Sequence, residues 1–193
     1  MTITIDHLNK NRNEDPAYWY LWASDFKNSF MFMYSHQIHL LDSEINIDLL
    51  PPEPGAVTMR TTYFCALELY MKAYLLSNDD KVKSSEDKPS YLKDTFGHNL
   101  DKLRKRCAEL DKEFDMPELI WIIEDLKILF KSDWSFLKYP PYRKALKSKT
   151  NQINKDKKLD QDVVMPGLSG EEQMFLPLNF LDNKVKAQNY IED

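Results

Sequence analysis

The sequence predicts an all-α protein, an up-and-down bundle of four to five helices with an irregular C-terminal extension. Two observations favour this fold class. Apolar residues recur at spacings of three and four along four stretches of the chain, which is the period of a helix with one buried face. The chain of 193 residues has only four glycines, whereas turn-rich β folds need many residues that tolerate positive φ.

The length fits one domain with a substantial core. The regular apolar pattern weakens before residue 146, so we expect a flexible N-terminus at 1–15 and a helical bundle at 16–145. The remainder, 146–193, is expected to be a basic connector and C-terminal extension.

The first helix is expected over 17–41, because Asp15 can cap it and Pro16 suits the first helical position. The prolines of 51–55 should stop it, since proline cannot donate to a helical hydrogen-bond ladder. The second helix is expected over 56–76, where apolar residues form one stripe.

The polar stretch 77–90 is expected to be a surface loop. A third helix should follow Asn99, which is a good N-cap. The fourth, at 117–131, is apolar on so many sides that it should lie centrally or contact a partner chain. The run 169–172 matches a capping box and predicts a short final helix that Pro177 interrupts.

Charge is unevenly distributed along the chain. Between Lys138 and Lys158 there are eight basic residues and one acid, a charge of +7, so a net charge of −5 leaves −12 elsewhere. The segment is either a solvated connector or a contact strip for phosphates or an acidic partner.

Other features narrow the class of protein. Cys65 and Cys107 fall on apolar positions of the expected helices and are interpreted as buried free thiols. No apolar run approaches the roughly 20 residues of a membrane span, and the N-terminus shows no apolar signal-peptide core. We therefore expect no membrane association and a cytoplasmic location.

Three short motifs occur in a characteristic order: 64–76 (FCALELYMKAYLL), 97–100 (GHNL) and 138–140 (KYP). In this order they resemble the HEPN superfamily of small helical bundles, over roughly 16–145. The resemblance implies a helical bundle, a homodimer, and a nucleotide or RNA as the class of ligand.

The chain departs from the catalytic members of that family. HEPN ribonucleases carry an arginine followed four to six residues later by a histidine, and no arginine of this chain has a histidine in that window. Lys138 stands where a similar branch has arginine, and lysine lacks the bidentate guanidinium fork. We therefore expect no catalytic residues.

The candidate ligand-binding residues are His98, near a helix N-terminus, and five residues of the basic segment: Lys138, Tyr139, Arg143, Lys144 and Lys147. The histidine either contacts a ligand or fixes the loop that enters the third helix. The five others offer phosphate contacts and a stacking face, or else pack at one end of the bundle.

Other polar residues are interpreted as structural. Glu68 and Lys72 are four apart and form an ion pair rather than acid–base machinery, and Arg60 is also interpreted as structural. His36 and His39 share a helix face, but no second ligand cluster accompanies them, so no metal site and no cofactor are expected.

The sequence favours a non-catalytic HEPN-like binding or interaction module, homodimeric, that contacts a nucleotide, RNA or a protein partner in a stress-response or defence system. One alternative is a HEPN-type ribonuclease toxin with atypical active-site residues. Another is a structural subunit of a larger complex with no small ligand.

Overall fold

The computed structural model describes residues 14–42, 54–129 and 170–189. Every regular element in these residues is helical, which confirms the all-α prediction. None of the described helices is both long enough and apolar enough to cross a bilayer.

Five of the helices have eleven residues or more: α2 (Pro16–Asp42), α3 (Pro54–Asn78), α6 (Leu100–Leu110), α7 (Pro117–Leu129) and α9 (Gly170–Asn189). Three elements are shorter: helix α4 (Asp80–Lys83), helix α5 (Lys88–Phe96) and the 3₁₀ turn η2 (Lys112–Asp115).

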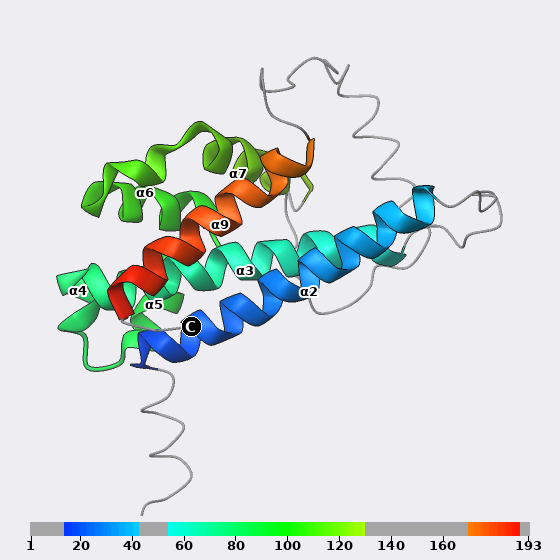
Figure 1. Ribbon diagram of the computed structural model, residues 1–193. Coiled ribbons are helices and arrows are strands. Elements are labelled where there is room, and N and C mark those ends of the chain that lie inside the picture. Colours follow the sequence, from blue (N-terminus) through cyan, green and yellow to red (C-terminus); the bar gives the residue numbers. More distant parts are fainter. Residues whose placement is uncertain (1–13, 43–53, 130–169, 190–193) are drawn as a thin grey trace, which may run out of the picture.

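Helix α3 is the centre of the bundle. It runs back alongside α2, and α9 packs against α3 and also contacts α2 (Figure 1). Helix α6 packs against α3, and α7 contacts α9. The side chains of Leu67, Tyr70, Met71 and Leu75 on α3 are wholly buried, as expected for a helix with neighbours on several sides.

Two predicted helix caps are confirmed. The Asp15 carboxylate accepts a hydrogen bond from the Ala17 amide at 2.9 Å at the start of α2. The Asn99 side chain accepts one from the Lys102 amide at 3.0 Å at the start of α6. Both contacts satisfy amides of a first helical turn, which have no partner within the helix.

The prediction of a surface loop over 77–90 was wrong. Helix α4 and the start of α5 lie there, capped by the carboxylates of Asp79 and Asp87. Each short helix has one fully buried apolar side chain, Val82 in α4 and Leu92 in α5. One apolar residue per turn is too little to create a recognisable period in the sequence.

The prediction that Pro177 interrupts a short final helix was also wrong, because α9 runs through the proline and is 20 residues long in all. Leu178, Leu181 and Val185 follow it and are all wholly buried. Burial of three side chains outweighs the roughly 3 kcal/mol that an internal proline costs a helix. This part of the expected C-terminal extension therefore belongs to the core.

Polar contacts also hold α9 in place. Asp182 accepts hydrogen bonds from the Tyr70 hydroxyl at 3.0 Å and from Lys27 at 2.7 Å. Burial acts to raise the pKa of Asp182, but the contacts with Lys27 and Tyr70 bring it below its ordinary value. On the other side of the helix, Lys184 donates to Asp111 at 2.7 Å. Helix α9 is thus tied to α2, α3 and the end of α6.

Candidate functional site

A buried charged pair lies on α3 beneath His98. Glu68 and Lys72 are each only 6% exposed and form an ion pair. Nδ1 of His98, in the segment between α5 and α6, lies 3.0 Å from both carboxylate oxygens of Glu68. The Trp19 ring of α2 lies over Lys72, 5.8 Å from Nζ to the ring centroid. The predicted pair is therefore a polar contact that joins three parts of the bundle.

The contact with Glu68 favours one tautomer of His98. A carboxylate oxygen accepts, so the hydrogen shared with Glu68 is assigned to Nδ1 of His98. The His98 side chain is 56% exposed. This contact attaches the segment that leads into the Asn99 cap to α3. It is consistent with a structural role for His98, and ligand binding by His98 stays a prediction.

Cys65 lies one turn before Glu68 on the same helix. Burial, and secondarily the charge of Glu68, raises the pKa of its thiol to about 11. The thiol therefore stays protonated near neutral pH, and the thiolate is the form that acts as a nucleophile. Cys107 is wholly buried, as predicted for a free thiol.

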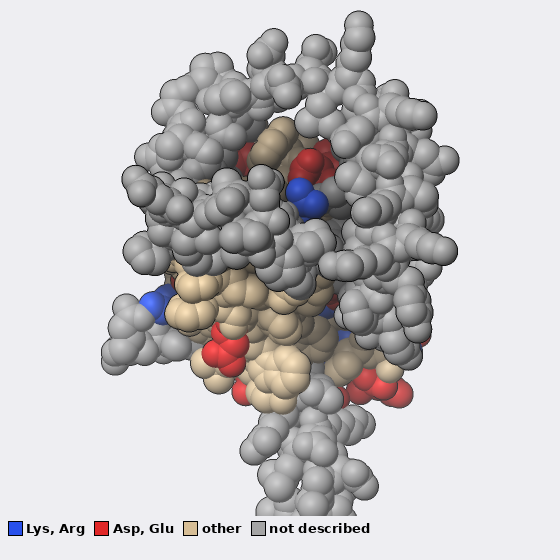
Figure 2. Space-filling model, turned by 90° about the vertical axis from the view of Figure 1, so that its right-hand side faces the viewer, with Lys and Arg blue, Asp and Glu red and all other residues tan. Residues whose placement is uncertain are grey.

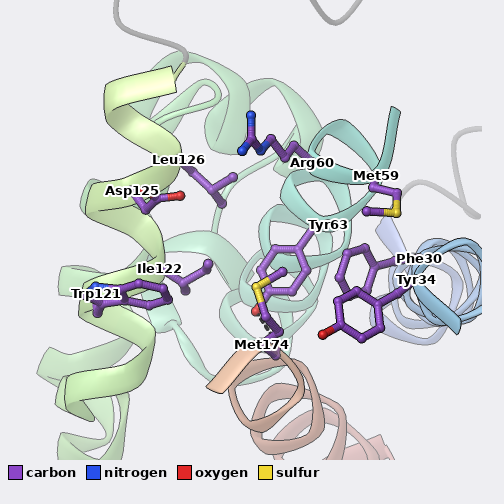
Figure 3. Close-up of a pocket in the computed structure, with 10 residues that line it drawn as sticks. All are labelled: Phe30, Tyr34, Met59, Arg60, Tyr63, Trp121, Ile122, Asp125, Leu126 and Met174. Carbon is purple, nitrogen blue, oxygen red and sulfur yellow. Dashed lines mark hydrogen bonds between the residues drawn. The ribbon is translucent and has the colours of Figure 1, made fainter. Parts of the chain in front are cut away.

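A pocket of about 260 Å³ lies between four helices, away from His98. It is lined by Phe30 and Tyr34 of α2, Met59, Arg60 and Tyr63 of α3, Trp121, Ile122, Asp125 and Leu126 of α7, and Met174 of α9 (Figure 3). Mostly apolar walls with a few polar groups are typical of small-molecule sites.

The inner wall of the pocket is held by ring packing and one hydrogen bond. The Phe30 ring meets Tyr63 edge-on, with 4.8 Å between centroids. The Tyr63 hydroxyl donates to the Met174 carbonyl at 2.7 Å, and burial raises its pKa, so it remains a donor. This wall is therefore formed before any ligand arrives.

Two charged side chains line the pocket, one from each of two facing helices. Arg60 extends from α3 toward α7, and the Asp125 carboxylate points from α7 toward α3 (Figure 3). Arg60 is exposed and Asp125 is half-buried. A guanidinium binds phosphate or carboxylate groups, and a carboxylate accepts the N–H groups of a heterocycle. Elsewhere at this end of the molecule, most of the described surface is uncharged (Figure 2).

The predicted site residues are only partly within the described residues. His98 is placed as above, away from the pocket, whereas Lys138, Tyr139, Arg143, Lys144 and Lys147 lie outside the described residues. The His36 ring is exposed and stacks on Phe32. The described residues contain no group of three or more metal-ligating side chains.

The sequence interpretation missed the pocket. Arg60 was interpreted as structural, yet it lies on the pocket margin with Tyr63 three residues further on. A cation one turn from a buried aromatic residue is the only local signal. The opposite wall, with Trp121 and Asp125, comes from a helix some 60 residues away in sequence, a placement that no local spacing can reveal.

Comparison with known proteins adds nothing to this geometry. Searches against protein-family models, curated proteins and solved structures find no match to the chain. The resemblance to HEPN domains therefore stays a prediction from the sequence.

Proposed function

We propose that this protein is a non-catalytic, HEPN-like binding module that takes a nucleotide in the pocket between α2, α3, α7 and α9. The observation that carries this proposal is the pairing of aromatic walls with one arginine and one aspartate. Flat rings favour a planar heterocycle, Arg60 suits a phosphate, and Asp125 suits the N–H groups of a base.

The size of the pocket limits what can enter. About 260 Å³ lies just below the roughly 300–1,000 Å³ of pockets that enclose drug-sized ligands. We therefore expect the base to enter, while the phosphate stays at the rim beside the exposed Arg60. In this arrangement the base buries its apolar surface in the pocket, and Arg60 recognises the charge of the phosphate.

Isothermal titration calorimetry with the four nucleoside monophosphates, their nucleosides and inorganic phosphate tests the proposal. Arg60→Gln should weaken binding of the best monophosphate about tenfold to hundredfold, because a charge-assisted hydrogen bond contributes roughly 1.5–3 kcal/mol. Binding of the matching nucleoside should change little. Asp125→Asn should alter the preference among bases.

The matched control is Lys127→Gln, which removes an exposed cation of α7 that pairs with Glu124 rather than lining the pocket. Its affinity should equal that of the wild type. Absence of heat for every nucleotide, or an equal loss in Lys127→Gln and Arg60→Gln, would remove the support for a nucleotide site.

The ribonuclease alternative has one feature in its favour, the contact of His98 with Glu68, because a carboxylate can orient an imidazole that acts as a base. A phosphorane also needs a positioned cation, and the Arg–His spacing of the family is missing. We expect no metal-independent cleavage of RNA above background. Robust cleavage that is lost in His98→Ala would favour the toxin instead.

The contacts of the pocket and of His98 do not test the remaining predictions from the sequence. A homodimer, contact with RNA through the basic segment, a protein partner and a cytoplasmic location all stay predictions from the sequence. The assay of RNA cleavage separates the binding module from the toxin, because a module binds RNA without cleaving it.

A further inference from the structure

Helix α2 leaves large apolar side chains in solvent. Its inner side packs on α3 and α9 through buried residues such as Ala23 and Phe30. On the outer side, Leu21 is 55% exposed, Trp22 51% and Phe32 75%. Clustered exposure of large apolar residues on a surface helix indicates an interaction surface.

The exposed residues follow a regular seam, which we name the α2 stripe. It consists of six residues at alternating spacings of four and three: Tyr18, Trp22, Asp25, Ser29, Phe32 and His36. All are exposed except Tyr18, which is half-buried. Such spacing is the pattern with which one helix packs along another.

The order of aromatic and polar residues along the α2 stripe is the same from either end. A pair of rings stands at each end, Tyr18 with Trp22 at 5.7 Å between centroids and Phe32 with His36 at 6.4 Å. The small polar residues Asp25 and Ser29 lie between the two ring pairs. A surface that maps onto itself when reversed is what a two-fold symmetric interface requires.

We infer that the α2 stripe is the interface of a homodimer in which the two copies of α2 pack antiparallel about a two-fold axis near residue 27. Trp22 of each copy then lies opposite Phe32 of the other. Each Asp25 lies opposite Ser29 of the other copy, whose hydroxyl can donate to the carboxylate. Aromatic groups meet aromatic groups and polar groups meet polar groups along the whole seam.

Other occupants of the α2 stripe fit less well. A parallel pair would bring the two Asp25 carboxylates together, which costs free energy through like-charge repulsion. An anionic membrane surface would meet Asp25 and no lysine or arginine of the stripe. The apolar side chains of α7, where the sequence suggested a partner contact, are mostly used within the bundle: Leu119, Ile122, Ile123 and Leu126 are buried.

The expected affinity of the dimer follows from the area that its interface buries. A single helix pair buries less than the roughly 800 Å² per partner of a standard stable interface. We therefore expect monomers and dimers in concentration-dependent equilibrium. The stripe shares no residue with the pocket, so the dimer forms whether or not the pocket binds a nucleotide.

Sedimentation velocity of the full chain over a concentration series tests the inference. Trp22→Glu and Phe32→Glu should each weaken dimerisation at least tenfold while the far-UV circular dichroism spectrum stays helical. Ile120→Glu is the control, because Ile120 is an exposed apolar residue of α7 at 37%, and it should dimerise as the wild type does. A monomer at every concentration, or loss of the dimer only in Ile120→Glu, overturns the inference.

Disulfide trapping tests the orientation without disturbing the central residues. Tyr18→Cys and His36→Cys proteins are mixed under mild oxidation, with wild type as the control for the native thiols. Residues 18 and 36 lie about 27 Å apart along the helix. An antiparallel pair should give the mixed disulfide between the two variants. Disulfides within each variant alone would show a parallel pair and contradict the two-fold arrangement.

Discussion

Asp79 combines near-complete burial with full pairing. It is 1% exposed, and its two oxygens accept hydrogen bonds from Nε and Nη2 of Arg106 at 2.6 and 2.7 Å. It also accepts from the Lys81 amide at 3.0 Å and so caps α4. One carboxylate thereby fixes a short helix and joins it to α6. The hydrogen bonds from Arg106 are the main reason that the pKa of Asp79 lies below its ordinary value.

Asp79→Asn should lower the free energy of unfolding at pH 7 by roughly 1.5–3 kcal/mol, because a charge-assisted pair is lost while a capping oxygen remains. Since the folded pKa of Asp79 is depressed, its contribution is complete above the unfolded pKa of about 3.9 and is lost as pH falls through the folded pKa. Urea denaturation between neutral and acidic pH measures both effects.

The control for this prediction is the neighbouring Asp80→Asn, whose side chain is fully exposed beside Lys83. It should leave stability nearly unchanged, because surface ion pairs contribute little. If the two variants lose equal stability, or if the wild type and Asp79→Asn respond identically to acid, the Asp79–Arg106 pair is not what stabilises this corner.

At the scale of elements, long helices were predictable and short ones were not. The stripes of α2, α3, α6 and α7 repeat over several turns, so tertiary packing and local pattern agree. Helix α4 has four residues and a single buried one, Val82. Pro177 disfavours a helix locally, but the burial of the apolar residues that follow it stabilises α9 by more than the proline costs.

Leu181→Ala tests whether α9 is part of the core. Leu181 is wholly buried, so removing its side chain should destabilise the protein by about 2–5 kcal/mol. Leu176→Ala is the matched control on the same helix, since Leu176 is 38% exposed, and it should cost much less. Chemical denaturation followed by circular dichroism measures both. Similar small losses would mean that α9 is only loosely attached.

At the scale of the whole molecule, the pocket is formed by residues that lie far apart in the sequence, so no local sequence spacing could predict it. Phe30 and Met174 both line the pocket and are 144 residues apart. The charge distribution, in contrast, is visible in the sequence alone: +7 over 138–158 against −12 elsewhere. The acidic remainder repels a polyanion unless the basic segment is held away from it.

Binding of single-stranded RNA, if mediated by the basic segment, should fall steeply with salt. Changing Lys138, Arg143, Lys144 and Lys147 together to alanine should reduce the log–log salt slope by about 3, because each phosphate contact on a single strand contributes roughly 0.7. The control removes an equal charge at exposed bundle positions: Lys81, Lys93, Lys102 and Lys112 to alanine. Fluorescence anisotropy with labelled RNA measures both slopes. Equal slopes for the two variants would assign the segment to a solvated connector.

The attachment of α9 has a consequence for biosynthesis. Tyr63 and the Met174 carbonyl that it contacts are 111 residues apart, and closing a loop of that length costs on the order of 4 kcal/mol of chain entropy. A nascent chain that has emerged only as far as α7 lacks Leu178, Leu181 and Val185, so the apolar groove that they fill stays open. Folding of this bundle therefore finishes only after α9 leaves the ribosome, and until then the chain presents a surface suited to chaperones and prone to aggregation.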